Sequence, residues 1–155
     1  MSPHPPYLDK FHPDLYRGLG DVAKQLRKVF PDVDLPTSLI ELVNVRVSQL
    51  NRCGTCLSIH VPAARRAGVD EYKLDVLPAW REVTAFTEQE NAALELAETL
   101  TLLPQGRKNG DAALAACEVF AEEQVAALEW AIILINAYNR ISIASHHPLL
   151  PPRKR

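Results

Sequence analysis

The chain of 155 residues lacks both a long apolar run and an excess of positive charge. Its longest apolar stretch, "WAIILINAY" from Trp130, is about half of the ~18–20 residues that a membrane helix needs, so we expect no membrane partner. The formal net charge of −2 argues against a nucleic-acid partner, because phosphate binding favours a basic face. The basic end, "PPRKR", is too short to change that expectation.

The sequence also lacks a secretory signal pattern and has only three cysteines. Its beginning, "MSPHPPYLDKFHP", is rich in proline and has no basic segment followed by an apolar one. We therefore expect a reducing, cytoplasmic location, where a Cys-x-x-Cys pair is more often catalytic or metal-binding than structural. The odd cysteine, Cys117, lies in an alanine-rich segment and is expected to be a small buried residue.

Alternation of apolar and polar residues, the mark of strands, is nearly absent, and helical spacing recurs instead. The sequence therefore predicts an all-α fold. Thr87 and Glu90 form a capping box that marks the clearest helix start. The last helix is apolar nearly all round from Val125 to Ile135, so we expect it to be central to the core or shared with another subunit. Helices are expected over residues 13–30, 35–52, 56–68, 87–103, 111–120 and 122–144, with short helical turns over 70–82.

Prolines divide the chain into three parts. Seven of the twelve lie in residues 3–13 and 148–152. We expect an extended N-terminal arm over 1–13, a single helical domain over 14–147 and a Pro-rich basic tail over 148–155.

The stretch "NRCGTCLSIH" over 51–60 carries the reactive side chains, and three interpretations of it are open. Cys53, Cys56 and His60 would supply three of the four ligands of a structural zinc ion. A second Cys-x-x-Cys or His pair is absent nearby, however, and the histidines at 146–147 lie far along the chain. A c-type haem would need His directly after the second cysteine, where Leu57 stands.

The second interpretation is thiol redox chemistry, and the third is an inert buried pair. Cys53 lies at the start of a predicted helix and Cys56 in its first turn, where free N–H groups and the helix dipole favour thiolate. One thiolate can attack a peroxide or a disulfide and the other can resolve the intermediate. His60 follows Cys56 by four residues, so both share one helix face and the imidazole could take the thiol proton.

A polar stripe on the preceding helix adds a possible third group. Glu41, Asn44, Ser48 and Asn51 lie opposite its apolar face. The stripe is either a solvated face or the lining of a pocket over the cysteine pair. In the second case Glu41 would orient His60 in a nucleophile–base–orienter set.

Glu41, eleven intervening residues, Cys53-x-x-Cys56 and His60 resemble the signature of alkylhydroperoxidase D-like (AhpD-like) proteins of the carboxymuconolactone decarboxylase superfamily. The similarity covers roughly residues 36–145. It implies a small AhpD-like helical domain and homo-oligomers such as trimers or hexamers, with a dimer also open. Within it, Cys53 and Cys56 would be the redox pair, and Glu41 and His60 the proton relay. Relatives often carry a second histidine just before the second cysteine, where this chain has Thr55.

The predicted function is that of an oxidoreductase, a thiol-dependent peroxidase or disulfide reductase. Cys56 would attack, Cys53 would resolve, and an external dithiol would reduce the resulting disulfide, with no bound cofactor and no metal. The resemblance implies a lipoyl group as that dithiol and a peroxiredoxin as a further partner. Two alternatives stay open: lactone decarboxylation, known in the same superfamily, and a zinc-stabilised module without enzymatic activity.

Overall fold

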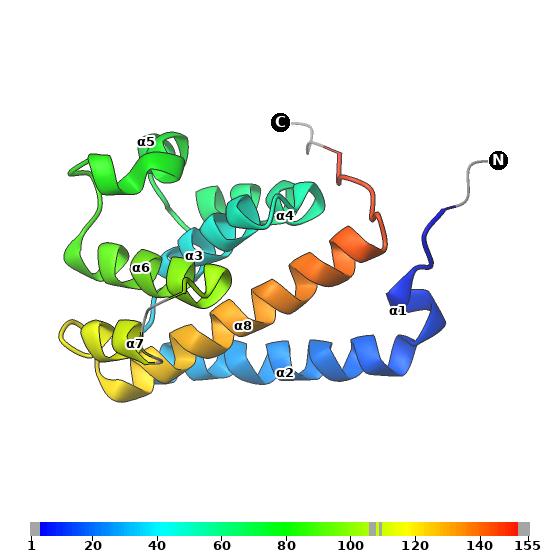
Figure 1. Ribbon diagram of the computed structural model, residues 1–155, viewed down its shortest axis with the longest axis horizontal. Helices are drawn as coiled ribbons and strands as arrows, with labels where there is room; N and C mark the ends of the chain where they lie inside the picture. The colour runs from blue at the N-terminus through cyan, green and yellow to red at the C-terminus, as the bar shows by residue number, and fades with distance from the viewer. Residues whose placement is uncertain (1–3, 106–107, 109, 152–155) are drawn as a thin grey trace.

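All regular structure in the computed structural model, which describes residues 4–105, 108 and 110–151, is helical (Figure 1). The predicted all-α class is therefore confirmed. The last four residues of the predicted tail and the first three of the predicted arm lie outside the described residues. None of the helices in the described part of the chain is long and apolar enough to cross a membrane.

Some of the helices begin at a residue whose side chain caps them. The Thr87 hydroxyl accepts the N–H of Glu90, whose carboxylate accepts the N–H of Thr87, so the predicted capping box is confirmed. Asp70 caps the short helix that follows Gly68. In chain order the elements are α1 (Leu8–Phe11), α2 (Pro13–Asp32), α3 (Thr37–Leu50), α4 (Gly54–Arg66), α5 (Glu71–Val76), the 3-10 helix η1 (Leu77–Glu82), α6 (Glu88–Leu102), α7 (Asp111–Ala116) and α8 (Glu122–Ala144).

Two local expectations were wrong. Residues 8–11, expected within an extended arm, form the single turn α1, because the Tyr7 carbonyl accepts the N–H groups of Lys10 and Phe11. Helix α7 stops at Ala116, so Cys117 is its C-cap and is exposed rather than buried. The alanine-rich composition predicted a helix but did not say which face of it would be covered.

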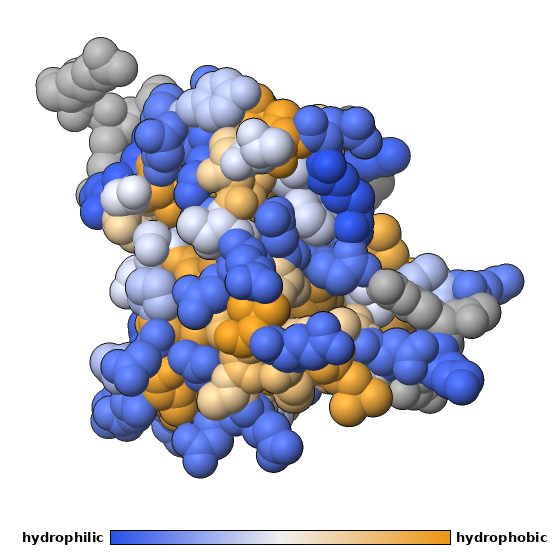
Figure 2. Space-filling view, turned by 90° about the vertical axis from the view of Figure 1, so that its left-hand side faces the viewer, coloured by the Kyte–Doolittle hydropathy of each residue, from blue (hydrophilic) through white to orange (hydrophobic). Residues whose placement is uncertain are grey.

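Helices α3 and α8 form the centre of the molecule. Helix α8 runs diagonally across it, and α2, α3 and α6 all pack against it (Figure 1). The main core lies among α3, α6, α7 and α8, where Val43, Val47, Leu96, Leu128 and Ile132 have no exposed surface. Helix α8, which the sequence predicted to be either central to the core or shared with another subunit, is thus central to the core. Around the end that carries α5 to α7, hydrophobic residues show between polar ones (Figure 2).

A network around Glu98 ties α3, η1 and α6 together. The Glu98 Oε1 atom accepts from Arg46 Nε (2.8 Å) and Nη2 (2.6 Å) and from Trp80 Nε1 (2.8 Å), while Oε2 accepts from Arg81 Nη2 (2.7 Å). Burial alone would raise the pKa of this carboxyl, but the hydrogen bonds from Trp80, Arg46 and Arg81 outweigh it and hold the pKa below its ordinary value. The network fixes the helix that carries Glu41.

Candidate active site

The two cysteines form a disulfide at the N-terminus of α4, with their Cα atoms 5.3 Å apart. Arg52 adopts a left-handed conformation (φ 55°), which ends α3 and turns the chain into α4. Cys53 is the N-cap of α4, and its sulfur accepts the N–H of Cys56 at 3.2 Å. Both residues are buried, with 1% and 3% of their surface exposed. The predicted position of the pair at a helix start is confirmed.

Glu41 and His60 meet across the α3–α4 packing. The Glu41 Oε2 atom lies 2.8 Å from His60 Nδ1, and the two side chains are only 17% and 21% exposed. Because a carboxylate can only accept, Nδ1 carries the hydrogen, and in the neutral imidazole Nε2 then keeps its lone pair. Within the described residues, Nε2 has no hydrogen-bond partner. The structure thus brings together the two predicted relay residues, with Nε2 left to exchange a proton.

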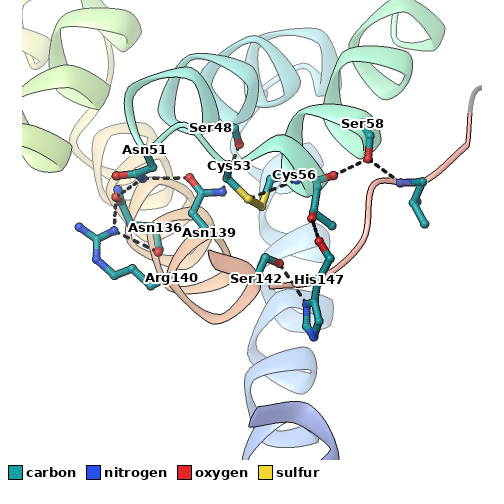
Figure 3. Close-up of a disulfide and its surroundings, with 12 residues drawn as sticks. Ser48, Asn51, Cys53, Cys56, Ser58, Asn136, Asn139, Arg140, Ser142 and His147 are labelled. Atoms are coloured by element: carbon teal, nitrogen blue, oxygen red, sulfur yellow. Dashed lines mark hydrogen bonds between the residues drawn. A yellow bond between two sulfur atoms is a disulfide. The ribbon is translucent and has the colours of Figure 1, made fainter. Parts of the chain in front are cut away.

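The polar stripe of α3 points inward, so its interpretation as a solvated face was wrong. Asn44 and Ser48 are buried. Ser48 Oγ accepts from Asn139 Nδ2 at 3.2 Å, and Asn51 Nδ2 donates to Asn139 Oδ1 and Asn136 Oδ1, both at 2.9 Å (Figure 3). These bonds join α3 to α8 beside the disulfide.

Sequence reasoning missed the role of Asn139 in these contacts. Its signal was available, because an amide on a largely apolar helix needs a polar partner when it is buried.

A cavity of about 930 Å³ is lined by residues from α2, α3, α4 and α8. Glu41, Asn44, Cys56 and His60 line it, whereas Cys53 does not. Most of the remaining wall is apolar and comes from α2, α3 and α8: Ala23, Leu26, Phe30, Ile40, Ala131, Leu134 and Ile135. A reactant in this cavity would therefore meet Cys56 and the relay together, in apolar surroundings.

A family model, described as the carboxymuconolactone decarboxylase family, matches residues 13–99, a span that includes Glu41, both cysteines of the pair and His60. The chain belongs to this family. Over 104 residues it is 41% identical to the uncharacterized protein YdfG of Bacillus subtilis (strain 168). These matched residues make up 67% of this chain and 71% of that protein.

The fold of this family member matches the crystal structure of a protein of unknown function from Agrobacterium tumefaciens, described as a candidate antioxidant defence protein AhpD. The TM-score is 0.83 at 25% identity, over 96% of this chain and 99% of that one. The AhpD-like fold predicted from the Glu–Cys-x-x-Cys–His signature is thus confirmed. An AhpD-like antioxidant family and a Cys-x-x-Cys disulfide fit a peroxidase or reductase role.

In this member of the family, the C-terminal segment covers the other side of α4. The Thr55 hydroxyl donates to the backbone carbonyl of His147 at 2.6 Å. The Leu150 N–H donates to Ser58 Oγ at 3.1 Å. A methyl group on Gly54 would lie 2.9 Å from the Leu149 side chain, so the segment approaches α4 closely.

The N-terminal residues in turn hold the C-terminal segment. His147 Nε2 lies 3.0 Å from Asp9 Oδ1, and its ring stacks on Tyr7 at 5.5 Å between centroids. The Leu8 N–H donates to Ser145 Oγ. The sequence placed His147 far from the cysteine pair, but the fold brings its backbone next to it. Among residues 4–105, 108 and 110–151, no three His, Cys, Asp or Glu side chains converge as a metal site would require.

Proposed function

We propose that this protein is a thiol-dependent peroxidase or disulfide reductase in which Cys53 and Cys56 alternate between dithiol and disulfide. The observation that carries the proposal is the shared cavity wall, where Cys56 stands beside His60 and its partner Glu41. The position at the N-terminus of α4 supports it, because free N–H groups and the helix dipole favour a thiolate there.

The peroxidase cycle begins with the reduced pair. His60 Nε2 takes the Cys56 proton, and the thiolate attacks the outer oxygen of a hydroperoxide. An S–O bond forms, the O–O bond breaks, and the leaving alkoxide receives the proton from His60. The Cys53 thiol then gives up its proton and attacks the Cys56 sulfur, so that the S–S bond forms, the S–O bond breaks, and the leaving hydroxide takes up a proton and departs as water. Overall, one peroxide is reduced by two electrons and the dithiol is oxidised to the disulfide.

An external dithiol closes the cycle by thiol–disulfide exchange and is itself oxidised. We propose a lipoyl-type dithiol for this step, and a peroxiredoxin as the protein that could draw electrons from the pair. If a partner disulfide replaces the peroxide as oxidant, the same cysteines act as a disulfide reductase. In both cases Glu41 fixes the hydrogen on His60 Nδ1 and leaves Nε2 free for the transfer.

The redox pair also distinguishes this proposal from the alternatives. A lactone decarboxylase needs groups that bind carboxylates and move a proton, but it has no use for a dithiol on the cavity wall. A zinc module needs free cysteine sulfurs and a fourth ligand, whereas here the two sulfurs are bonded to each other and His60 is bonded to Glu41.

The decisive experiment is a thiol titration before and after one equivalent of cumene hydroperoxide. The reduced protein has three thiols. We expect the peroxide to remove two of them and dihydrolipoamide to restore both. Cys53→Ser and Cys56→Ser should each abolish turnover with a dithiol donor, whereas Cys117→Ser, at the exposed third cysteine, should not. Turnover that survives both of the first two substitutions would refute the proposal.

We also propose that the chain forms a homo-oligomer, a trimer or hexamer. Four large apolar residues of α6, its C-cap and α8 are each exposed by more than half: Leu102, Leu103, Trp130 and Ile133. Leu103 and Ile133 border the same shallow depression between α6 and α8. Sedimentation at micromolar concentration should give an oligomer, and Ile133→Asp should reduce it to a smaller species. A wild-type monomer under those conditions would contradict this proposal.

A further inference from the structure

The cavity beside Cys56 is far larger than hydrogen peroxide requires. Its volume of about 930 Å³ lies in the range of about 300–1,000 Å³ that is typical of sites for small organic ligands. A molecule of water, by comparison, occupies about 30 Å³ in the liquid. With walls made mainly of aliphatic and aromatic side chains from α2 and α8, the cavity is suited to a ligand with an apolar body.

One positively charged side chain of the cavity wall has no carboxylate partner among the described residues. Glu41 is paired with His60, and Lys24 lies 2.9 Å from Asp21. Asp34 lies beyond the end of α2, which is Asp32, and forms no ion pair with Arg27. Arg27 has no carboxylate within ion-pairing distance among the described residues.

A second polar group on the cavity wall is within the electrostatic influence of Arg27. Tyr138 lines the same cavity from α8, and its hydroxyl has no hydrogen-bond partner in the described part of the chain. The hydroxyl oxygen lies 4.0 Å from where a methyl group on Gly20 would stand, which places it against α2. Burial, with a smaller effect of Tyr16, raises the pKa of the Tyr138 phenol, and the nearby charge of Arg27 offsets only part of this. The phenol therefore remains a donor.

We propose that this cavity binds amphipathic carboxylates, with the carboxylate held by Arg27 and the Tyr138 hydroxyl and the apolar chain held between α2 and α8. A guanidinium and a neutral phenol are donors only towards a carboxylate, and together they could satisfy it at the edge of an apolar space. If the protein is the peroxidase proposed above, its substrates would be organic hydroperoxides that carry such a carboxylate; this part of the inference rests on the proposed function. The binding itself does not depend on the chemistry.

Binding is tested with unreactive probes on the disulfide form of the full chain. Dodecanoate and its methyl ester are titrated calorimetrically below their aggregation limits. We expect the wild type to bind dodecanoate about tenfold more tightly than the ester, and Arg27→Gln to remove that difference. Tyr138→Phe should weaken dodecanoate binding by several-fold. The matched control is Lys28→Gln, because Lys28 is exposed, neighbours Arg27 and does not line the cavity; its affinity should stay within about twofold of the wild type.

Equal binding of acid and ester, or equal losses in Arg27→Gln and Lys28→Gln, would overturn the inference. Absence of dodecanoate binding would also overturn it, including the case in which a second copy of the chain fills the cavity. Turnover forms the second arm. The ratio of kcat/KM for linoleic acid hydroperoxide to that for cumene hydroperoxide should fall about tenfold in Arg27→Gln and stay unchanged in Lys28→Gln.

The two arms separate the two proposals. Cumene hydroperoxide turnover without dodecanoate binding would refute the carboxylate site and leave the proposed function standing. Arg27-dependent binding of dodecanoate without any peroxide turnover would support the carboxylate site and refute the peroxidase.

Discussion

The substitution Glu41→Gln tests the relay most directly. Gln keeps the size of the side chain and an oxygen that can accept from His60 Nδ1, but it loses the charge. Both side chains are less than a quarter exposed, so solvent screens their 2.8 Å contact only in part. The substitution therefore weakens the hydrogen bond that holds His60 in the orientation with Nε2 free.

The size of the effect follows from that hydrogen bond. A hydrogen bond to a charged group contributes about 1.5–3 kcal/mol, and each ~1.36 kcal/mol corresponds to a factor of ten in rate. Gln keeps a neutral hydrogen bond of about 1 kcal/mol, so the loss is about 0.5–2 kcal/mol; if this loss is fully expressed in the transition state, Glu41→Gln slows attack by Cys56 about 2- to 30-fold. His60→Ala removes the base itself and should cost about 10²- to 10⁴-fold.

The double variant decides whether Glu41 acts through His60. The assay is a single turnover, in which reduced protein is mixed with cumene hydroperoxide, quenched with acid and titrated for remaining thiols. If Glu41 only orients His60, then Glu41→Gln in a His60→Ala background has no further effect, and the double variant matches His60→Ala within about twofold. If the rate losses of the two single variants instead multiply in the double variant, the relay is refuted. The matched control is Glu82→Gln, at an exposed carboxylate that lies outside the cavity wall and should leave the rate unchanged.

Three further substitutions test the frame around the site. Glu98→Gln should cost about 1.5–3 kcal/mol of unfolding free energy at pH 7 in urea. Folding lowers the pKa of Glu98, so its contribution to the unfolding free energy is fully present above its ordinary pKa of about 4.5 and is lost as the pH falls through the lower folded-state pKa. A stability difference between the wild type and Glu98→Gln that stays constant down to pH 3 would contradict this. Thr87→Ala removes the N-terminal cap of α6 and should lower the unfolding free energy by about 1 kcal/mol in the same assay. A loss below about 0.3 kcal/mol would show that the cap does not stabilise the helix. Thr55→Val removes the hydrogen bond that holds the His147 carbonyl against α4, so it should speed reduction of the disulfide by a large dithiol protein more than by dithiothreitol. Equal acceleration would argue that the C-terminal segment does not limit access to the disulfide.

The helices were predictable because their signals are local. Apolar residues at a spacing of three and four, the Thr87–Glu90 box and the proline at the start of α2 all act within one or two turns of chain. The proximity of Cys56 and His60 on one face of α4 follows from the same periodicity. Glu41 required more, because its distance from His60 depends on how α3 packs on α4, and the resemblance to the family supplied that information.

The contacts that were not predictable join distant parts of the chain. Asn51 and Asn139 are 88 positions apart, and Thr55 and His147 are 92 apart. Helical periodicity says which residues share a face, but it does not say which second helix covers that face. This is why the polar stripe of α3 could be interpreted as either solvated or buried until α8 was placed against it.

The first two turns of α4 therefore place their residues in two different environments. At about 100° per residue, Cys56 and His60 point to one side of the helix, while Gly54 and Ser58 point to nearly the opposite side. The first side opens on the cavity, and the second is covered by the C-terminal segment. A small or apolar peroxide can reach Cys56 through the cavity without disturbing that segment. A bulky dithiol protein has no comparable path from the second side, so access to the disulfide, rather than its chemistry, should separate small reductants from large ones.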